Sequence, residues 1–246
     1  MPIELSQTRV IDLPLIDASG VENRKRWVDL GLVLLISFSP PIFAATVAWL
    51  WPGADANLWS YVRYASGIMR EITSLLLLMY VLARQNRSLS SIGLRIRLNW
   101  SDPLIALGLA VAGTVWSAIQ SGLISRGTLL LFGHHADMRH PDTTSGAPVL
   151  LLLSYGILAG IFEETLVRGY LMTEMIALGK PVWLAAIASI ALQTSYHLYY
   201  GFAGALSISS VFIVFAIYFA FSRRLFPVIL AHAFLDIFAM LYRVHH

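Results

Sequence analysis

Seven long, nearly uncharged stretches constrain the fold of this chain more than any other feature. A helix that crosses the hydrocarbon core of a bilayer needs about 20 mostly apolar residues. Stretches that meet this requirement lie at 28–51, 62–83, 103–124, 148–167, 181–200, 204–221 and 226–242. Only 13% of all residues are charged, against roughly 25% in soluble domains. We therefore predict an all-α fold, a polytopic transmembrane helix bundle of about seven spans.

The order of polar and apolar segments predicts three regions without internal repeats. Residues 1–27 read as a polar N-terminal tail, 28–147 as N-terminal membrane helices with connecting loops, and 148–242 as a membrane core that carries most of the buried polar groups. The first span contains the sequence SPP at 39–41, and proline in a helix interior removes a hydrogen bond and clashes with the preceding turn. We expect a kink or a break there.

The basic residues predict the orientation of the bundle. Lysine and arginine concentrate in alternate loops: before the first span, after the second, before the fifth and before the seventh. The positive-inside rule then places the N-terminus in the cytoplasm, and we expect a multi-pass protein of a bacterial plasma membrane. The residues concerned are Arg24, Lys25, Arg26, Arg84, Arg87, Arg95, Arg97, Lys180, Arg223 and Arg224.

Composition also excludes several kinds of chemistry. The chain has no cysteine, which removes disulfides, cysteine nucleophiles and cysteine-based zinc sites. The formal net charge of +3 resides in short loops between apolar runs, so we expect the lipid bilayer as a partner and no nucleic acid. The oligomeric state stays open at this stage.

Ionisable residues inside the apolar runs are functional candidates, because each is expensive to place at membrane depth. Glu164 and Arg168 are four residues apart, so they share a helical face and can pair. His232 and Asp236 have the same spacing, and a carboxylate there can orient an imidazole. The complete set is Arg70, Glu71, Glu163, Glu164, Arg168, His197, His232 and Asp236.

A helical hairpin would bring Glu163 close to His197. The expected turn at 179–181 lies about seventeen residues after Glu163 and about seventeen before His197, so both side chains stand at similar depth. His232 lies much nearer to the turn that precedes its own helix than Glu163 and His197 lie to the turn between theirs. We therefore expect the helix that carries Glu163 to bend after Arg168, with Glu174 exposed to water.

These residues alone leave several functions open. A carboxylate and two histidines from three helices can hold a metal or activate a water, and similar groups serve proton relays in transporters. In a non-catalytic scaffold protein, these polar residues can instead pair with each other inside the helix bundle. For Arg70 and Glu71 we expect a structural role, in pairs with other helices.

Three motifs resemble those of the CPBP family, the CAAX proteases and bacteriocin-processing enzymes of the abortive-infection type. The sequence EETLVR at 163–168 resembles EExxxR, His197 in SYHLYYG resembles the histidine of FxxxH, and HAFLD at 232–236 resembles HxxxN/D. The resemblance covers a four-helix catalytic core over about 148–242. One position departs from the pattern, since Gln193 replaces the phenylalanine of FxxxH, a residue that we expect to pack and not to react.

The resemblance implies an intramembrane endopeptidase and a role for each motif residue. Glu163 would be the general base for the attacking water, which His197 would help to hold. His232 with Asp236 would stabilise the tetrahedral oxyanion. Two further residues would be orienting or structural: Glu164 and Arg168.

The resemblance is compatible with two mechanisms. Family members are described both as metal-dependent and as glutamate-activated without metal. Zinc is possible, with Glu163, His197 and His232 as its ligands. We favour a mechanism that requires no cofactor, because EExxxR contains no motif such as HExxH that places two ligands on one helical face.

The expected substrate is a membrane-associated or lipidated peptide or protein, cut near the cytoplasmic half of the bilayer. The sequence identifies neither the substrate nor its cleavage site, and it shows no prenyl-binding cavity. The alternative is a non-catalytic membrane scaffold or bacteriocin-immunity protein on the same fold.

Overall fold

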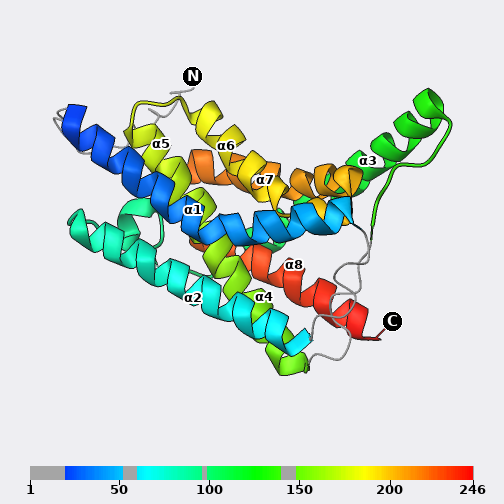
Figure 1. Cartoon of the computed structure of the whole chain (residues 1–246), viewed down its shortest axis with the longest axis horizontal. Helices are drawn as coiled ribbons and strands as arrows, with labels where there is room; N and C mark the ends of the chain where they lie inside the picture. Colours follow the sequence, from blue (N-terminus) through cyan, green and yellow to red (C-terminus); the bar gives the residue numbers. More distant parts are fainter. Residues whose placement is uncertain (1–19, 52–59, 96–98, 140–147, 246) are drawn as a thin grey trace, which may run out of the picture.

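The computed structural model describes residues 20–51, 60–95, 99–139 and 148–245, and every regular element in these ranges is helical (Figure 1). The all-α prediction is therefore confirmed. Five helical segments are long and apolar enough to cross a membrane, as expected of a multi-pass integral membrane protein. They are Glu22–Leu50, Tyr64–Arg84, Ser101–Phe132, Val149–Ala177 and Phe202–Ser222.

The first helix, α1 (Gly20–Leu50), begins inside the segment predicted as a polar tail. Of that tail, residues 1–19 lie outside the described residues. The helix continues through Pro40 and Pro41, so of the expected kink or break it does not show the break. Figure 1 shows α1 changing direction partway along its length, as a proline pair in a helix interior requires.

The next two long helices are α2 (Ser60–Arg84) and α3 (Ser101–Phe132), joined by a connector that contains the short 3-10 helix η1 (Leu89–Ile92). The span predicted to end at 124 continues to Phe132, so the outer loop predicted at 125–147 begins only at Gly133. Gly133 ends α3 with φ 71°, a left-handed conformation that suits glycine. Figure 1 shows the end of α3 projecting beyond the other helices.

The EETLVR motif lies in a continuous helical rod. Helix α4 (Val149–Glu164) passes into a π-helical segment, η2 (Thr165–Met172), and then into α5 (Thr173–Ala177). Glu174 in α5 is fully buried, so the expectation that it meets water is wrong. Its carboxylate binds Arg26 and Arg87.

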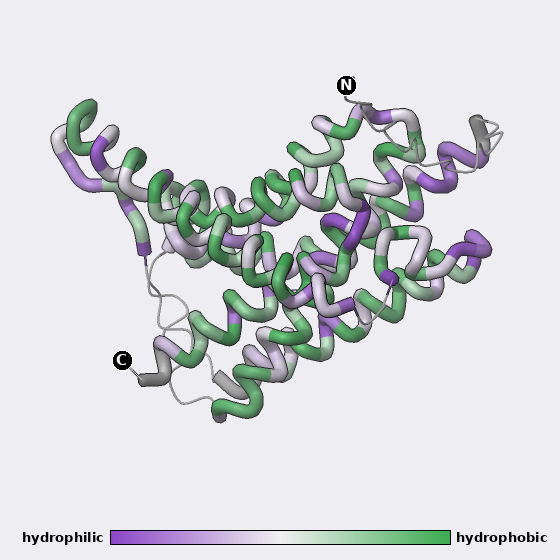
Figure 2. The backbone as a smooth tube through the Cα atoms, turned by 180° about the vertical axis from the view of Figure 1, so that it is seen from behind, coloured by the Kyte–Doolittle hydropathy of each residue, from purple (hydrophilic) through white to green (hydrophobic). Residues whose placement is uncertain are grey.

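The remaining elements are α6 (Val182–Ser195), the 3-10 helix η3 (Leu198–Tyr200), α7 (Phe202–Ser222) and α8 (Phe226–His245). Helix α4 packs on α2 and α8, and α7 packs on α3 and α6. Figure 2 shows hydrophobic residues over most of this bundle, with hydrophilic residues where α1 begins and α2 ends. Helix α6 and the apolar part of α8 are shorter than the five candidate spans.

Candidate active site

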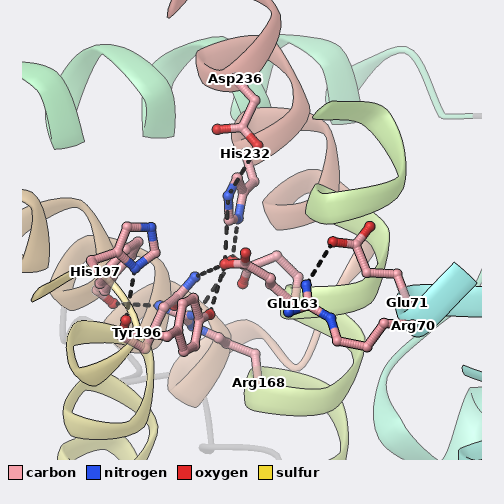
Figure 3. Close-up of polar contacts among 11 residues, drawn as sticks. Arg70, Glu71, Glu163, Arg168, Tyr196, His197, His232 and Asp236 are labelled. Atoms are coloured by element: carbon pink, nitrogen blue, oxygen red, sulfur yellow. Dashed lines mark hydrogen bonds and ion pairs between the residues drawn. The ribbon is translucent and has the colours of Figure 1, made fainter. Parts of the chain in front are cut away.

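The four residues predicted to carry the chemistry line one cavity of about 570 Å³ inside the bundle. Glu163 comes from α4, His197 from the link between α6 and η3, and His232 and Asp236 from α8. Figure 3 shows Glu163 at the centre of this group, with His232 and Asp236 on one side and His197 on another. The hairpin expected from sequence spacing therefore brings Glu163 and His197 to the same cavity.

Two neutral donors hold the carboxylate of Glu163. Gln193 Nε2 donates a hydrogen bond of 2.8 Å and the Tyr196 hydroxyl one of 2.7 Å, both to Oε2. The two donors lie on the last turn of α6 and directly after it. They orient the carboxylate without neutralising it with a permanent cation.

Glu164 anchors His232. The Nδ1 atom of the imidazole lies 2.7 Å from Glu164 Oε1, and a carboxylate can only accept here, so Nδ1 carries the proton. Nε2 faces two other carboxylates, with Asp236 Oδ2 at 3.6 Å and Glu163 Oε2 at 3.8 Å. The spacing argument expected Asp236 to orient the imidazole, but in the structure Glu164 makes the short hydrogen bond.

Glu164 and Arg168 form the predicted pair and are both fully buried. Arg168 Nη1 lies 3.3 Å from Glu164 Oε1, and Nη2 donates to the Phe212 carbonyl oxygen at 3.2 Å. Arg168 lies in the π-helical segment, a kind of helix irregularity that often occurs at functional sites. The pair links α4 to α7 and supports the carboxylate that anchors His232.

Aromatic rings surround His197. Tyr196 lies 4.8 Å from it and Phe212 5.0 Å, measured between ring centroids. Nδ1 lies 2.8 Å from the Gln193 carbonyl oxygen, which can only accept, so Nδ1 carries the proton. In the neutral ring, Nε2 is then a hydrogen-bond acceptor.

Two glycines bring α4 close to α8. A Cβ atom on Gly160 would lie 3.0 Å from the Ala233 backbone nitrogen, and one on Gly156 would lie 3.2 Å from Asp236 Cβ. The spacing of these glycines is GxxxG, which permits close helix contact in membranes. This contact places Glu163 and Glu164 beside His232.

Arg70 and Glu71 lie at the edge of the site and pair with each other at 3.1 Å; among the ion pairs of the described residues, neither forms the pair with another helix that had been expected. Arg70 also lines the cavity and lies 5.6 Å from the centre of the Phe162 ring. Figure 3 shows the pair on the side of Glu163 away from His197.

Sequence reasoning missed two residues of the site, Gln193 and Tyr196. Position 193 was expected only to pack, yet its amide binds Glu163. A signal was available, because Gln193 lies one helical turn before His197 and is a polar residue in an apolar helix.

The possible zinc ligands line one cavity, but the described part of the chain contains no group of three or more His, Cys, Asp or Glu side chains that could hold a metal ion. Gln193 and Tyr196 already donate hydrogen bonds to Oε2 of Glu163.

Fold and site together define a multi-pass membrane protein with a carboxylate–imidazole centre beside a cavity. Residues 145–238 match the family model described as Rce1-like, type II CAAX prenyl endopeptidase. This part of the chain is therefore similar to a family of proteases, as the three motifs indicated. Helices α1 to α3 lie outside the matched region. No curated protein and no solved structure matches the chain.

Proposed function

We propose that this protein is an intramembrane endopeptidase that hydrolyses peptide bonds of membrane-associated or lipidated substrates with a water activated by Glu163. The observation that carries the proposal is the convergence of Glu163, His197, His232 and Asp236 on one cavity inside the matched family domain.

The gap between Glu163 and His232 suits a water molecule. Glu163 Oε2 and His232 Nε2 are 3.8 Å apart, and a water that makes hydrogen bonds of about 2.8 Å to both fits across this separation. We propose that His197, which lines the same cavity with Nε2 as an acceptor, also helps to hold this water.

In the proposed reaction, Glu163 takes a proton from the water as its oxygen bonds to the carbonyl carbon of the scissile peptide. The carbonyl oxygen becomes an oxyanion, which accepts a hydrogen bond from Nε2–H of the His232 imidazolium. The carbon–nitrogen bond then breaks, and the proton on Glu163 passes to the leaving nitrogen. General base catalysis of this kind typically contributes 10²–10⁴-fold.

Glu164 and Arg168 act as positioning residues in this scheme. Glu164 fixes the ring plane and the tautomer of His232 through Nδ1. Arg168 balances the charge of Glu164 in a place without water access.

We infer that no metal ion takes part, because Gln193 and Tyr196 already bind Oε2 of Glu163 as hydrogen-bond donors. The proposed topology has seven crossings, with α6 and α8 as short spans, and a cytoplasmic N-terminus.

Cleavage by the purified protein in lipid bilayers tests this function. Wild type and Glu163→Gln would be incubated with a set of membrane-associated peptides, with and without a strong chelator, and the products read by mass spectrometry. We expect cleavage by wild type that survives chelation and is lost in the variant. A wild type that cuts nothing would favour the scaffold alternative, and chelator-sensitive activity restored by zinc would overturn the metal-free mechanism.

A further inference from the structure

The cavity of the candidate active site occupies one half of the bundle. Helix α1 contributes its last part, from Phe38 to Ala48, and α2 its first part, from Tyr64 to Arg70. Helix α8 contributes residues from His232 to Met240. The cavity therefore extends from Glu163 toward the end of the bundle where α1 ends and α2 begins.

Most of the basic residues that the structure describes lie at the opposite end, with exceptions such as Arg70 and Arg139. Arg26 and Arg87 both bind Glu174, and the Lys180 ammonium lies 5.8 Å from the centre of the Trp27 ring. The turn between α7 and α8 joins the same end, because the Leu225 amide donates to the Gly93 carbonyl oxygen at 3.1 Å. By the positive-inside rule, this basic end faces the cytoplasm.

Packed side chains separate the cavity from the basic end. Between Glu163 and Glu174 along the rod, Leu166, Tyr170 and Met172 are fully buried. A second cavity, of about 630 Å³, lies at the basic end, and it shares no lining residue with the first.

We propose that substrates reach Glu163 from the non-cytoplasmic face of the membrane. The proposal rests on the proposed function and narrows its substrate class to apolar segments of peptides or proteins exposed on that face. It departs from the cytoplasmic-side cleavage expected from the sequence.

The walls of the cavity suit such a segment. Helix α1 lines it with small apolar side chains, including Pro41, Ala44 and Ala48, and α8 adds Ala239 and Met240. Aromatic rings stand at the same end, and they are Tyr64, Tyr155, Tyr199 and Tyr200.

The segment after α3 fixes one edge of this opening. The Arg139 amide donates to the Tyr200 carbonyl oxygen at 2.7 Å, and its guanidinium donates to the carbonyl oxygens of Ala48 at 3.2 Å and Trp49 at 3.0 Å. Arg139 thus ties the end of α1 to η3, and both elements line the cavity. The sequence did not indicate a role for the loop after α3. In the structure, Arg139 of this loop binds two elements that line the cavity.

The absence of cysteine from the natural chain makes this route directly testable. Single cysteines would be placed in the cavity, as Ala48→Cys and Met240→Cys, and at the basic end, as the control Ser90→Cys. Intact cells would be treated with a membrane-impermeant maleimide before and after permeabilisation. We expect both cavity variants to react before permeabilisation and the control only afterwards.

Any other pattern in folded variants overturns the proposed route, including a control that reacts in intact cells. This readout does not require catalysis, so it holds even if the proposed function fails. Once a peptide that the protein cleaves is known, the Met240→Cys variant can be modified with the maleimide from outside. This modification should lower the rate at which the variant cleaves the peptide at least tenfold. Unchanged cleavage after complete modification would refute the route and leave the protease assignment standing.

Discussion

Two carboxylates on one helical rod, Glu174 fully buried and Glu163 partly buried, have opposite surroundings. Glu174 is held by charge, because Arg26 donates to Oε2 through Nε at 3.1 Å and Nη2 at 2.9 Å, while Arg87 binds Oε1. Glu163 is held by the neutral donors Gln193 and Tyr196 and borders a cavity. Both oxygens of Glu174 are bound by guanidinium groups, whereas Gln193 and Tyr196 orient Glu163 and leave it open to the cavity. The Glu174 region therefore suits stability and the Glu163 region suits chemistry.

The largest expected effect separates these two regions by activity. Glu163→Gln keeps the shape of the side chain but cannot accept the water proton, so we expect the rate of peptide cleavage to fall about 10²–10⁴-fold. The melting temperature should change little. Cleavage assays and thermal unfolding in the same detergent measure both quantities. Near wild-type turnover would mean that another group is the base.

The matched variant Glu174→Gln should show the reverse pattern. It leaves the buried guanidinium of Arg26 and the partly buried one of Arg87 without their anion, and breaking a buried ion pair typically costs about 3–5 kcal/mol of stability. We expect a strongly lowered melting temperature and unchanged turnover per folded molecule. A stable but inactive Glu174→Gln protein would show that this cluster also takes part in the reaction.

Glu164→Gln should give an intermediate effect on activity. The amide weakens the bond to His232 Nδ1, and a hydrogen bond to a charged group contributes about 1.5–3 kcal/mol, or roughly 10–100-fold in rate. The loss should fall on kcat and not on KM, because the residue positions His232 and does not bind substrate.

Asp236→Asn is the control for Glu164→Gln. Its Oδ2 lies 3.6 Å from Nε2, so this variant should keep more activity than Glu164→Gln. The reverse order would make Asp236 the partner on which His232 depends.

Much of the fold and the members of the site could be predicted from the sequence, because both follow from local patterns. Apolar runs set the helices, and the i, i+4 spacing of Glu164 and Arg168 set their pairing. Contacts between distant segments could not be predicted in this way. Arg26 and Glu174 are 148 residues apart, and Glu164 and His232 are 68 apart, so no local spacing reveals these pairs. The π-helical segment was not predicted for a related reason, because no local sequence pattern indicates it.

The smallest expected effect concerns Tyr196, a donor that the motif pattern did not reveal. Tyr196→Phe keeps the ring, which stacks at 5.4 Å from Phe38, and removes only the 2.7 Å hydrogen bond to Glu163. One neutral hydrogen bond contributes about 0.5–1.5 kcal/mol, so we expect turnover to change roughly 2–10-fold. The pH profile is informative, because the loss of a donor can act on the orientation of the carboxylate or on its affinity for a proton. Lower turnover with an unchanged pH profile would make orientation the main role of Tyr196, and a shifted profile would show that Tyr196 tunes the base. Tyr80→Phe, a change at an exposed tyrosine of α2, is the control and should leave both quantities unchanged.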